Sequence, residues 1–269
     1  PLYHFLPSSK SLSLGTVGCN FKCSFCQNWN ISQEKIVDKT RYFSPKDIVD
    51  LASKHNCLSI SYTYNEPTIF YPYAKDIAIE AKKIGIRNVF VSNGYESTEV
   101  IEDMDGVIDA VNIDLKSYND DYYKKELGGN LQKVLDNLKL FVKKGIWIEV
   151  TTLIVPTKND SPKELEQIAG FIADELGKHV PWHISAFHPD FKEQLLPRTP
   201  LESLQKAYEI GKKKGLQYIY MGNVQNQNNT YCCECNEQLI QRNGFGKTQS
   251  FLNGDKCPEC SKKLEGIFL

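Results

Sequence analysis

The sequence predicts an α/β fold, a partial (β/α)6 TIM-like barrel followed by a small C-terminal cysteine-rich module. Short apolar runs alternate with amphipathic stretches from about residue 11 to residue 224, which is the pattern of parallel βαβ units. Polar side chains recur where these apolar runs end, and barrels of this kind carry their chemistry at the carboxyl ends of the strands. Beyond about residue 225 the composition changes, and cysteines recur at metal-ligand spacing.

Each βα repeat can be assigned from its periodicity. The apolar runs predict strands at Ser11–Val17, Cys57–Tyr64, Asn88–Ser92, Ala110–Leu115, Trp147–Val155, Trp182–Phe187 and Gln217–Met221. Amphipathic segments predict helices near Ser44–His55, Pro67–Ile84, Ser97–Met104, Leu131–Lys144, Ser161–Leu176 and Thr199–Lys214. Six or so right-handed repeats close most of a barrel.

End signals support several of these helices. Ser44 and Ser161 each precede a proline at the first helical position and an acidic residue at the third, as expected for N-caps. Gly85, Gly145 and Gly215 each follow a lysine-bearing helix end, where a left-handed residue is expected.

Length and charge limit the functional classes. A chain of 269 residues can bury a large core. We assign residues 1–224 to the barrel core and residues 225–269 to the separate module, with Asn223–Asn229 as a polar linker. A net charge of −1 does not indicate a broad surface for duplex nucleic acid. Without a signal peptide or a long apolar run, the chain is predicted to be cytoplasmic and to lack a membrane span.

The first group of cysteines has the spacing C-x3-C-x2-C, at Cys19, Cys23 and Cys26. Three thiolates can hold three irons of a [4Fe–4S] cluster and leave the fourth iron open. Incidental thiols, a disulfide fragment and a partial zinc site are the alternatives. A zinc knuckle is normally C-x2-C with a partner pair elsewhere, which the extra Cys19 does not fit. Cys57 stands alone and is expected to be a small buried hydrophobic residue.

The second group has the spacing C-x2-C-x21-C-x2-C if it uses Cys232, Cys235, Cys257 and Cys260. This is the zinc-ribbon arrangement, and zinc would fold a unit too small for a core of its own. A rubredoxin-like iron, an auxiliary iron–sulfur cluster and free thiols remain open. The adjacent Cys233 leaves the first ligand undecided, although the spacing favours Cys232.

The motif from Gly18 to Trp29, with the aromatic Phe25 before its last cysteine, resembles the radical S-adenosylmethionine (SAM) superfamily. That resemblance implies a radical SAM barrel in which the open iron binds SAM. Further motifs resemble the branch of pyruvate formate-lyase activating enzymes, in which a Gly-Gly-Glu segment contacts the SAM amino group. Here both glycines are replaced, and the segment reads Tyr64-Asn65-Glu66. The cofactor-binding residues that this branch implies are Phe25, Asn65, Glu66, Ser92, Asn93, Asp114, Leu115, Lys116 and His188.

These residues also have ordinary structural interpretations. Glu66 could begin a helix, Lys116 could pair with Asp114, and His188 could be packed at a strand end. A carboxylate such as Glu66 and a cation such as Lys116 nevertheless suit opposite ends of the zwitterionic SAM. The remaining histidines are expected to be structural or exposed, and Thr152 is as well explained by a strand interior as by a cofactor contact. No catalytic residue can be assigned.

The whole chain resembles one subgroup more closely, the radical SAM enzyme of the AmmeMemoRadiSam system. The shared segments are Tyr3–Pro7, Gly18–Gln33, Tyr64–Pro67 and a cysteine-rich C-terminal module. The resemblance implies Memo-like and AMMECR1-like proteins as candidate partners, together with a ferredoxin- or flavodoxin-type electron donor.

The predicted function is reductive cleavage of SAM to a 5′-deoxyadenosyl radical, which abstracts hydrogen from an unidentified small molecule, peptide or RNA. One alternative is an activase that makes a glycyl radical on a partner protein. An alternative of another class is a non-catalytic iron–sulfur redox sensor or nucleic-acid-binding protein. Retention of Glu66 and of Asp114-Leu115-Lys116 argues against the last, because a cluster holder needs no SAM pocket.

Overall fold

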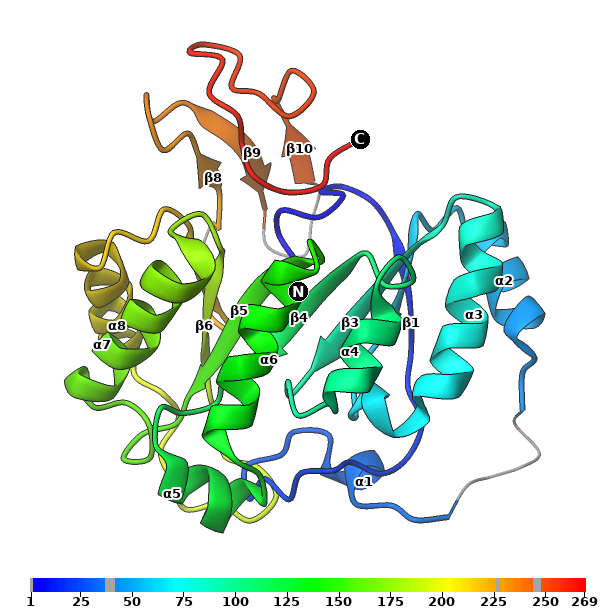
Figure 1. Ribbon diagram of the computed structural model, residues 1–269. Helices are drawn as coiled ribbons and strands as arrows, with labels where there is room; N and C mark the ends of the chain where they lie inside the picture. The colour runs from blue at the N-terminus through cyan, green and yellow to red at the C-terminus, as the bar shows by residue number, and fades with distance from the viewer. Residues whose placement is uncertain (1, 37–41, 226–227, 244–247) are drawn as a thin grey trace. The chain divides into compact units, whose positions relative to one another are not determined.

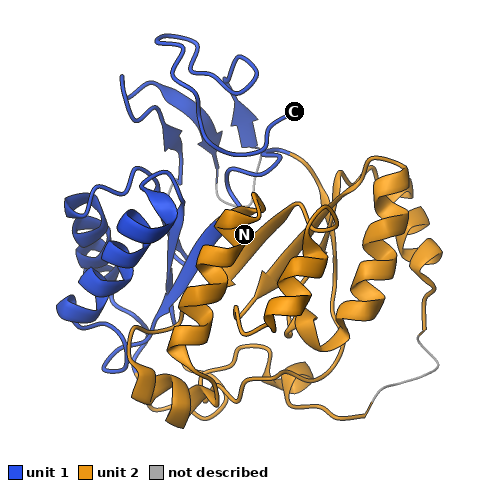
Figure 2. Ribbon diagram, in the orientation of Figure 1, with its two compact units in different colours: residues 1–8, 149–188, 197–269 blue, residues 9–148, 189–196 orange. Residues whose placement is uncertain are grey.

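The computed structural model describes residues 2–36, 42–225, 228–243 and 248–269 (Figure 1). It divides into two compact units (Figure 2). Unit 1 comprises residues 1–8, 149–188 and 197–269, and unit 2 comprises residues 9–148 and 189–196. No helix within the described ranges has both the length and the apolar character needed to cross a membrane.

Unit 2 is built on four parallel strands that follow one another in chain order. These are β1 (Ser11–Leu14), β2 (Ser59–Tyr62), β3 (Arg87–Ser92) and β4 (Ala110–Asp114). Its longer helices are α2 (Pro45–Lys54), α3 (Tyr71–Lys83), α4 (Thr98–Met104) and α6 (Leu131–Lys143), of which α3, α4 and α6 lie on one side of the strands (Figure 1). Shorter segments are α1 (Trp29–Ser32), the 3₁₀-helix η2 (Pro67–Phe70), α5 (Asp120–Tyr122) and the π-helix η3 (Tyr123–Leu127).

Unit 1 contains a second set of parallel strands and a small antiparallel sheet. The parallel strands are β5 (Trp147–Ile154), which begins in the last two residues of unit 2, β6 (Trp182–Ala186) and β7 (Ile219–Gly222). The helices are α7 (Pro162–Phe171), the π-helix η4 (Ile172–Gly177) and α8 (Leu201–Lys213). The antiparallel sheet has the order β10-β9-β8, from β8 (Thr230–Tyr231), β9 (Gln238–Arg242) and β10 (Thr248–Ser250).

The predicted α/β class with seven parallel strands is therefore confirmed, whereas closure into a partial barrel stays a prediction. The predicted caps are also confirmed. Ser44 forms a capping box with Asp47, and the Ser161 side chain accepts the hydrogen bond of the Glu164 amide. Gly85, Gly145 and Gly215 all have the expected positive φ.

Several predicted boundaries were wrong. The helix predicted at Pro67–Ile84 is a 3₁₀ turn followed by α3, because Pro72 lacks an N–H and is confined to the first turn of the α-helix. The first strand stops at Leu14 rather than Val17. A Cβ on Gly15 would lie 2.6 Å from the Thr63 carbonyl oxygen, so only glycine allows the chain to leave the sheet there. The short segments α1, α5 and η3 carry too few periodic residues to be found from sequence.

A buried polar network within unit 1 joins the N-terminal residues to β5 and β6. The Glu149 carboxylate accepts hydrogen bonds from the Tyr3 amide (2.9 and 2.8 Å), the His4 amide (2.8 Å) and His183 Nε2 (2.5 Å). Burial alone raises the pKa of Glu149, but these donors outweigh it and lower the pKa to about 2. The described contacts give His4 and His183 structural positions, and Cys57 is buried as expected.

The C-terminal sheet is held to the N-terminal residues of the same unit. The Arg242 guanidinium lies 4.3 Å from the centre of the Tyr3 ring and donates to the Tyr3 carbonyl (2.7 Å). Tyr220 on β7 contacts His4 Nε2 (2.6 Å) and Thr230 on β8 (2.7 Å) through its hydroxyl. Through these contacts the N-terminal segment packs against the cysteine-rich module and helps to hold it in place.

Candidate active site

The loop between β1 and α1 carries the first three cysteines and is fixed by main-chain hydrogen bonds. The Gly18 amide donates to the Ile31 carbonyl (2.8 Å), and the Lys22 amide donates to the Leu127 carbonyl (2.9 Å). Cys23 is buried, while Cys19 and Cys26 are partly exposed. Burial raises the pKa of Cys19, and raises that of Cys23 to about 12. With such a pKa these side chains stay protonated on their own. They become thiolates only when a nearby cation or a bound metal cluster stabilises the negative charge.

Asn65, which follows β2, forms hydrogen bonds with residues that precede Cys19. Its Oδ1 accepts from the Thr16 amide (3.0 Å), and its Nδ2 donates to Thr16 Oγ1 (3.2 Å) and to the Gly18 carbonyl (2.9 Å). The neighbouring Tyr64 adopts a φ of +74°, a conformation that favours glycine and costs energy for tyrosine. Its carbonyl accepts from Asn28 Nδ2 (2.8 Å). The β2 end and the cysteine loop are thus locked together.

Glu66 follows on the same loop and is buried, with a relative exposure of 2%. Its Oε1 accepts from the Thr68 amide (3.0 Å), the Thr68 hydroxyl (2.6 Å) and the Ser92 hydroxyl (2.9 Å). Its Oε2 accepts from the Asn93 amide (2.8 Å). Burial raises the pKa of Glu66, and these hydrogen bonds oppose the rise by favouring the ionised form. The structure therefore places a buried, hydrogen-bonded carboxyl group just after β2, and its contact with SAM stays a prediction.

Ser92 and Asn93, at the end of β3, connect Glu66 to the cysteine loop. Asn93 Nδ2 donates to Asn20 Oδ1 (2.6 Å) and lies 4.0 Å from Cys19 Sγ. The next residue, Gly94, has a φ of +75°, and a Cβ there would lie 2.7 Å from the Ile113 side chain. Glycine is therefore required for this loop to turn beside β4.

Sequence reasoning missed Glu96, a buried carboxyl group on the loop after β3 that lies near Glu66. Its relative exposure is 1%, and its Oε1 contacts the Ser92 hydroxyl and, at 3.4 Å, the Thr68 hydroxyl. Burial first, and then the charge of Glu66, raise the pKa of Glu96 to about 8. Its place two residues after the Ser92-Asn93-Gly94 motif was the available signal. Burial of its side chain could not be read from the sequence.

Asp114 and Lys116 follow β4 and form an ion pair, with Nζ 2.7 Å from Oδ2. Burial lowers the pKa of Lys116, but the Asp114 carboxylate and the Cys23 thiol more than offset this and raise it overall. The lysine charge in turn favours the thiolate forms of Cys19 and Cys23. The pairing that we considered as a structural alternative is present, and it leaves the ammonium group beside the cluster thiols. Leu115 between the two is fully buried.

Phe25, in the cysteine motif, is buried and lies parallel to Tyr122, with ring centres 6.4 Å apart. In the described part of the chain, two buried side-chain polar atoms lack a hydrogen-bond partner, Tyr122 OH and Glu96 Oε2. Tyr122 is close enough to Cys23 for the thiol to contribute to the raised pKa of the phenol. Both orphaned atoms therefore belong to the surroundings of the cysteines and Glu66, which fits a site built to receive a polar cofactor.

Two predicted residues lie outside this description. His188 follows β6 in unit 1, so its contact with the cofactor stays a prediction. Thr152 is fully buried in β5, where its hydroxyl accepts the hydrogen bond of Trp182 Nε1 (3.0 Å), as expected of a strand interior.

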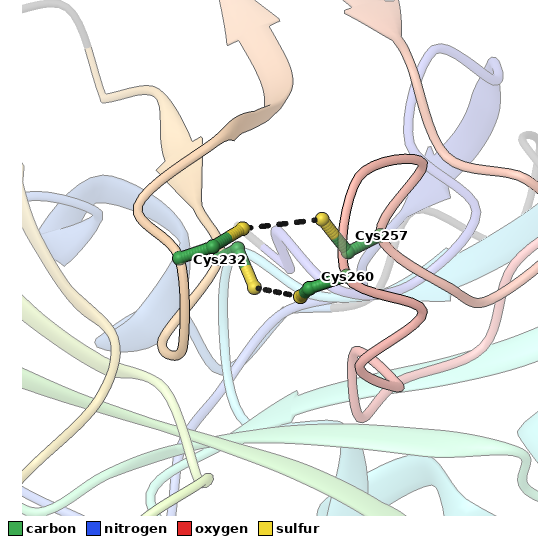
Figure 3. Close-up of side chains that lie close together, drawn as sticks. Cys232, Cys257 and Cys260 are labelled. Carbon is green, nitrogen blue, oxygen red and sulfur yellow. Dashed lines mark hydrogen bonds between the residues drawn. The ribbon is translucent and has the colours of Figure 1, made fainter.

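The C-terminal cysteines form a second site (Figure 3). The sulfurs of Cys232, Cys235, Cys257 and Cys260 all lie within 4.8 Å of one another, and no other group of potential single-ion ligands occurs in the described residues. Cys232 and Cys260 are 3.5 Å apart, and Cys235 and Cys257 are 3.6 Å apart. A tetrahedral ion with metal–sulfur bonds of about 2.3 Å places its sulfurs about 3.8 Å apart. The geometry fits such an ion and selects Cys232 rather than Cys233.

Comparison with known proteins shows the family of the chain. Residues 13–172 match the model of the radical SAM superfamily. The chain is 42% identical to an uncharacterized protein of Methanocaldococcus jannaschii, over 98% of this chain and 80% of that protein. It is 25% identical to the pyruvate formate-lyase-activating enzyme of Clostridium pasteurianum, over 62% of this chain and 72% of the relative.

Among solved structures, Streptococcus suis SuiB bound to the precursor peptide SuiA has a TM-score of 0.64. It is 13% identical, with 82% of this chain and 49% of that chain covered, and so supports the fold alone. The family match spans the three cysteines, Glu66 and the Asp114–Lys116 segment. The chain belongs to the radical SAM superfamily and is an enzyme of the radical SAM class.

Proposed function

We propose that this enzyme cleaves SAM reductively at the site formed by the first three cysteines, Glu66 and Lys116. A [4Fe–4S] cluster with one open iron would bind SAM there and supply the electron for its cleavage, so that the 5′-deoxyadenosyl radical formed would take hydrogen from a substrate. Cys19, Cys23 and Cys26 would hold the cluster. Glu66 Oε2 accepts one hydrogen bond among the described residues, from Asn93, and has capacity left for the SAM amino group.

The observation that carries this proposal is that chemically complementary groups occur together in one unit. Successive strand ends bring a buried carboxylate, an ammonium and three thiols into one unit. The Lys116 ammonium can meet a carboxylate, and Tyr122 OH has hydrogen-bonding capacity that none of the described residues uses. A protein that only held a cluster would gain nothing from burying these groups, because each unpaired one costs free energy.

The test is anaerobic reconstitution with iron and sulfide, followed by addition of SAM and a reductant. The wild-type protein is expected to form 5′-deoxyadenosine, and Cys23→Ala is expected to lose both the cluster and the product. Cys57→Ala is the matched control, because Cys57 is equally buried but stands apart from both groups. Product formation by Cys23→Ala at the wild-type rate would refute the assignment.

For the substrate, we infer a small molecule, a peptide or an RNA, with hydrogen abstraction as the common step. Deuterium carried from substrate into 5′-deoxyadenosine would identify the substrate in fractionated extracts. An activase is the second candidate, because a relative is named as a pyruvate formate-lyase-activating enzyme. A lasting glycyl radical signal after incubation of extract with enzyme and SAM would favour the activase over the first candidate. Electrons would come from a ferredoxin- or flavodoxin-type donor.

For the four C-terminal thiols, we propose one structural zinc ion. The sulfur spacing suits zinc or a single iron equally, and Cys232 and Cys257 lie within a small buried cluster with Leu239, Ile240 and Leu264. Metal analysis of a Cys19→Ala, Cys23→Ala, Cys26→Ala protein separates the two sites. One zinc per chain is the expected result, and one iron per chain with the visible spectrum of a ferric tetrathiolate would contradict it.

A further inference from the structure

Glu96 is buried at a position where an ionised carboxylate is unstable unless a cation or a proton neutralises its charge. The side chain is 1% exposed, and its Oε2 has no partner among the described residues. Its main-chain carbonyl is fixed by Asn137 Nδ2 on α6 (2.9 Å), which also holds the Gly94 carbonyl (2.9 Å). The loop therefore cannot simply swing the carboxyl group into water. A buried carboxyl group without a cation is most stable when it is protonated.

The number of hydrogen atoms available for hydrogen bonds also indicates that one of the two carboxyl groups is protonated. The Ser92 hydroxyl has one hydrogen, yet its oxygen lies against two carboxyl oxygens, Glu66 Oε1 (2.9 Å) and Glu96 Oε1. The Thr68 hydroxyl is likewise within 2.6 Å of Glu66 and 3.4 Å of Glu96. The hydroxyls cannot serve both carboxyl groups fully. A further hydrogen on one of the carboxyl groups resolves the shortage.

Glu96 is the better place for that hydrogen. Glu66 has two main-chain amide donors, from Thr68 and Asn93, which stabilise its ionised form, whereas the main-chain donor to Glu96 is its own amide and its Oε2 has no partner among the described residues. Ionisation of both would place two like charges in one buried site. The titratable neighbours are few: η2, β3 and α6 present hydroxyl and amide groups, and the cysteine loop presents the Cys19 thiol, whose pKa the Glu66 charge helps to raise.

We propose that Glu96 is a positioning residue of the SAM site, which shares a proton with Glu66 through the Ser92 hydroxyl and so fixes the charge of the two carboxyl groups at −1. This inference rests on the proposed function, because it assigns the pair to SAM. The ionised Glu66 can accept a hydrogen bond from the SAM amino group through Oε2, and the shared proton holds Glu66 with Oε2 directed away from Ser92. No bond other than hydrogen bonds forms or breaks.

The test compares the wild-type protein with Glu96→Gln, which keeps the shape and can donate the same hydrogen bond but cannot ionise. Calorimetry on the cluster-reconstituted proteins gives the dissociation constant for SAM from pH 6 to pH 9.5. We expect equal affinities near pH 6. As the pH rises through about 8, wild-type Glu96 loses its proton and gains a charge that attracts the cationic SAM sulfonium. The ratio of dissociation constants, Glu96→Gln over wild type, should then rise by on the order of tenfold. Titration of SAM itself cancels in this ratio.

A second measurement needs no cluster. Infrared difference spectra of the apoprotein at pH 6 should contain the carbonyl stretch of a protonated carboxyl group that Glu96→Gln removes. Glu99→Gln, on the exposed first turn of α4, should leave that band in place. Absence of the band, or a ratio of dissociation constants that does not change with pH, overturns the inference. If the wild-type protein binds no SAM at any pH, the proposed function fails instead, while the infrared result still decides the protonation of Glu96.

Discussion

Replacement of Asn65 by alanine tests whether this side chain supports the cysteine loop or contacts the cofactor. The change removes three hydrogen bonds, to the Thr16 amide, the Thr16 hydroxyl and the Gly18 carbonyl. At a net value of about 1 kcal/mol each, the free energy of unfolding should fall by about 3 kcal/mol. In urea this corresponds to a decrease of about 1 M in the unfolding midpoint. Because the loop carries Cys19, iron bound per chain after reconstitution should also fall, before any SAM is added.

Asn65→Asp separates the two roles. An aspartate keeps the acceptor for the Thr16 amide but turns a second oxygen toward the Gly18 carbonyl, so the loop should be destabilised at least as much as by alanine. If Asn65 instead bound the SAM ammonium group directly, aspartate would preserve iron content and strengthen SAM binding. Gln132→Ala, an exposed amide on α6, is the control. A wild-type urea midpoint and full iron content in Asn65→Ala would refute the supporting role.

Three further predictions concern other parts of the chain. Glu149 has a pKa of about 2, below the unfolded value of 4.5, so it contributes stability above pH 4.5 that is lost as the pH falls toward 2. Glu149→Gln should therefore flatten the dependence of the melting temperature on pH between 4.5 and 2. An unchanged dependence in this range would contradict the assignment. Metal analysis should show that Cys257→Ser abolishes metal binding by the C-terminal module and that Cys233→Ser retains it. Equal loss of metal in both variants would show that the selected ligand set is wrong. Gly129→Ala would place a Cβ 2.6 Å from the Phe21 ring, so we expect a loss of about 1–3 kcal/mol in urea unfolding, and a loss below 0.5 kcal/mol would mean that the ring moves freely.

Much of the scaffold was predictable because its signals are local. The N-cap of Ser44 and the left-handed Gly85 each depend on a few neighbouring residues, and both are as expected. The helix predicted from Pro67 was divided because one proline changed the hydrogen bonding of a single turn. Segments of three to five residues, such as α5 and η3, have no period long enough to detect.

The candidate site was predictable to the extent that its residues belong to motifs. Glu66, Ser92 and Asn93 were named from resemblance, and the structure joins them through direct hydrogen bonds. Asn65 was named as a cofactor residue, yet the partners that its amide has in the structure are main-chain and hydroxyl groups of the cysteine loop. Glu96 was not named at all. Its role depends on a hydroxyl from β3 and another from η2, and no spacing along the chain encodes that meeting.

The sequence by itself determined the class of enzyme. Three cysteines within eight residues keep their sulfurs close enough together for one cluster, because the short spacing limits how far apart they can lie. The tertiary structure decided which groups surround these cysteines and how deeply each group is buried. The burial of Glu96 against Glu66, and the selection of Cys232 over its neighbour, both depend on segments distant in sequence packing together and excluding water. Desolvation is a property of the packed interior, so its effects on charge can be derived only once the fold is known.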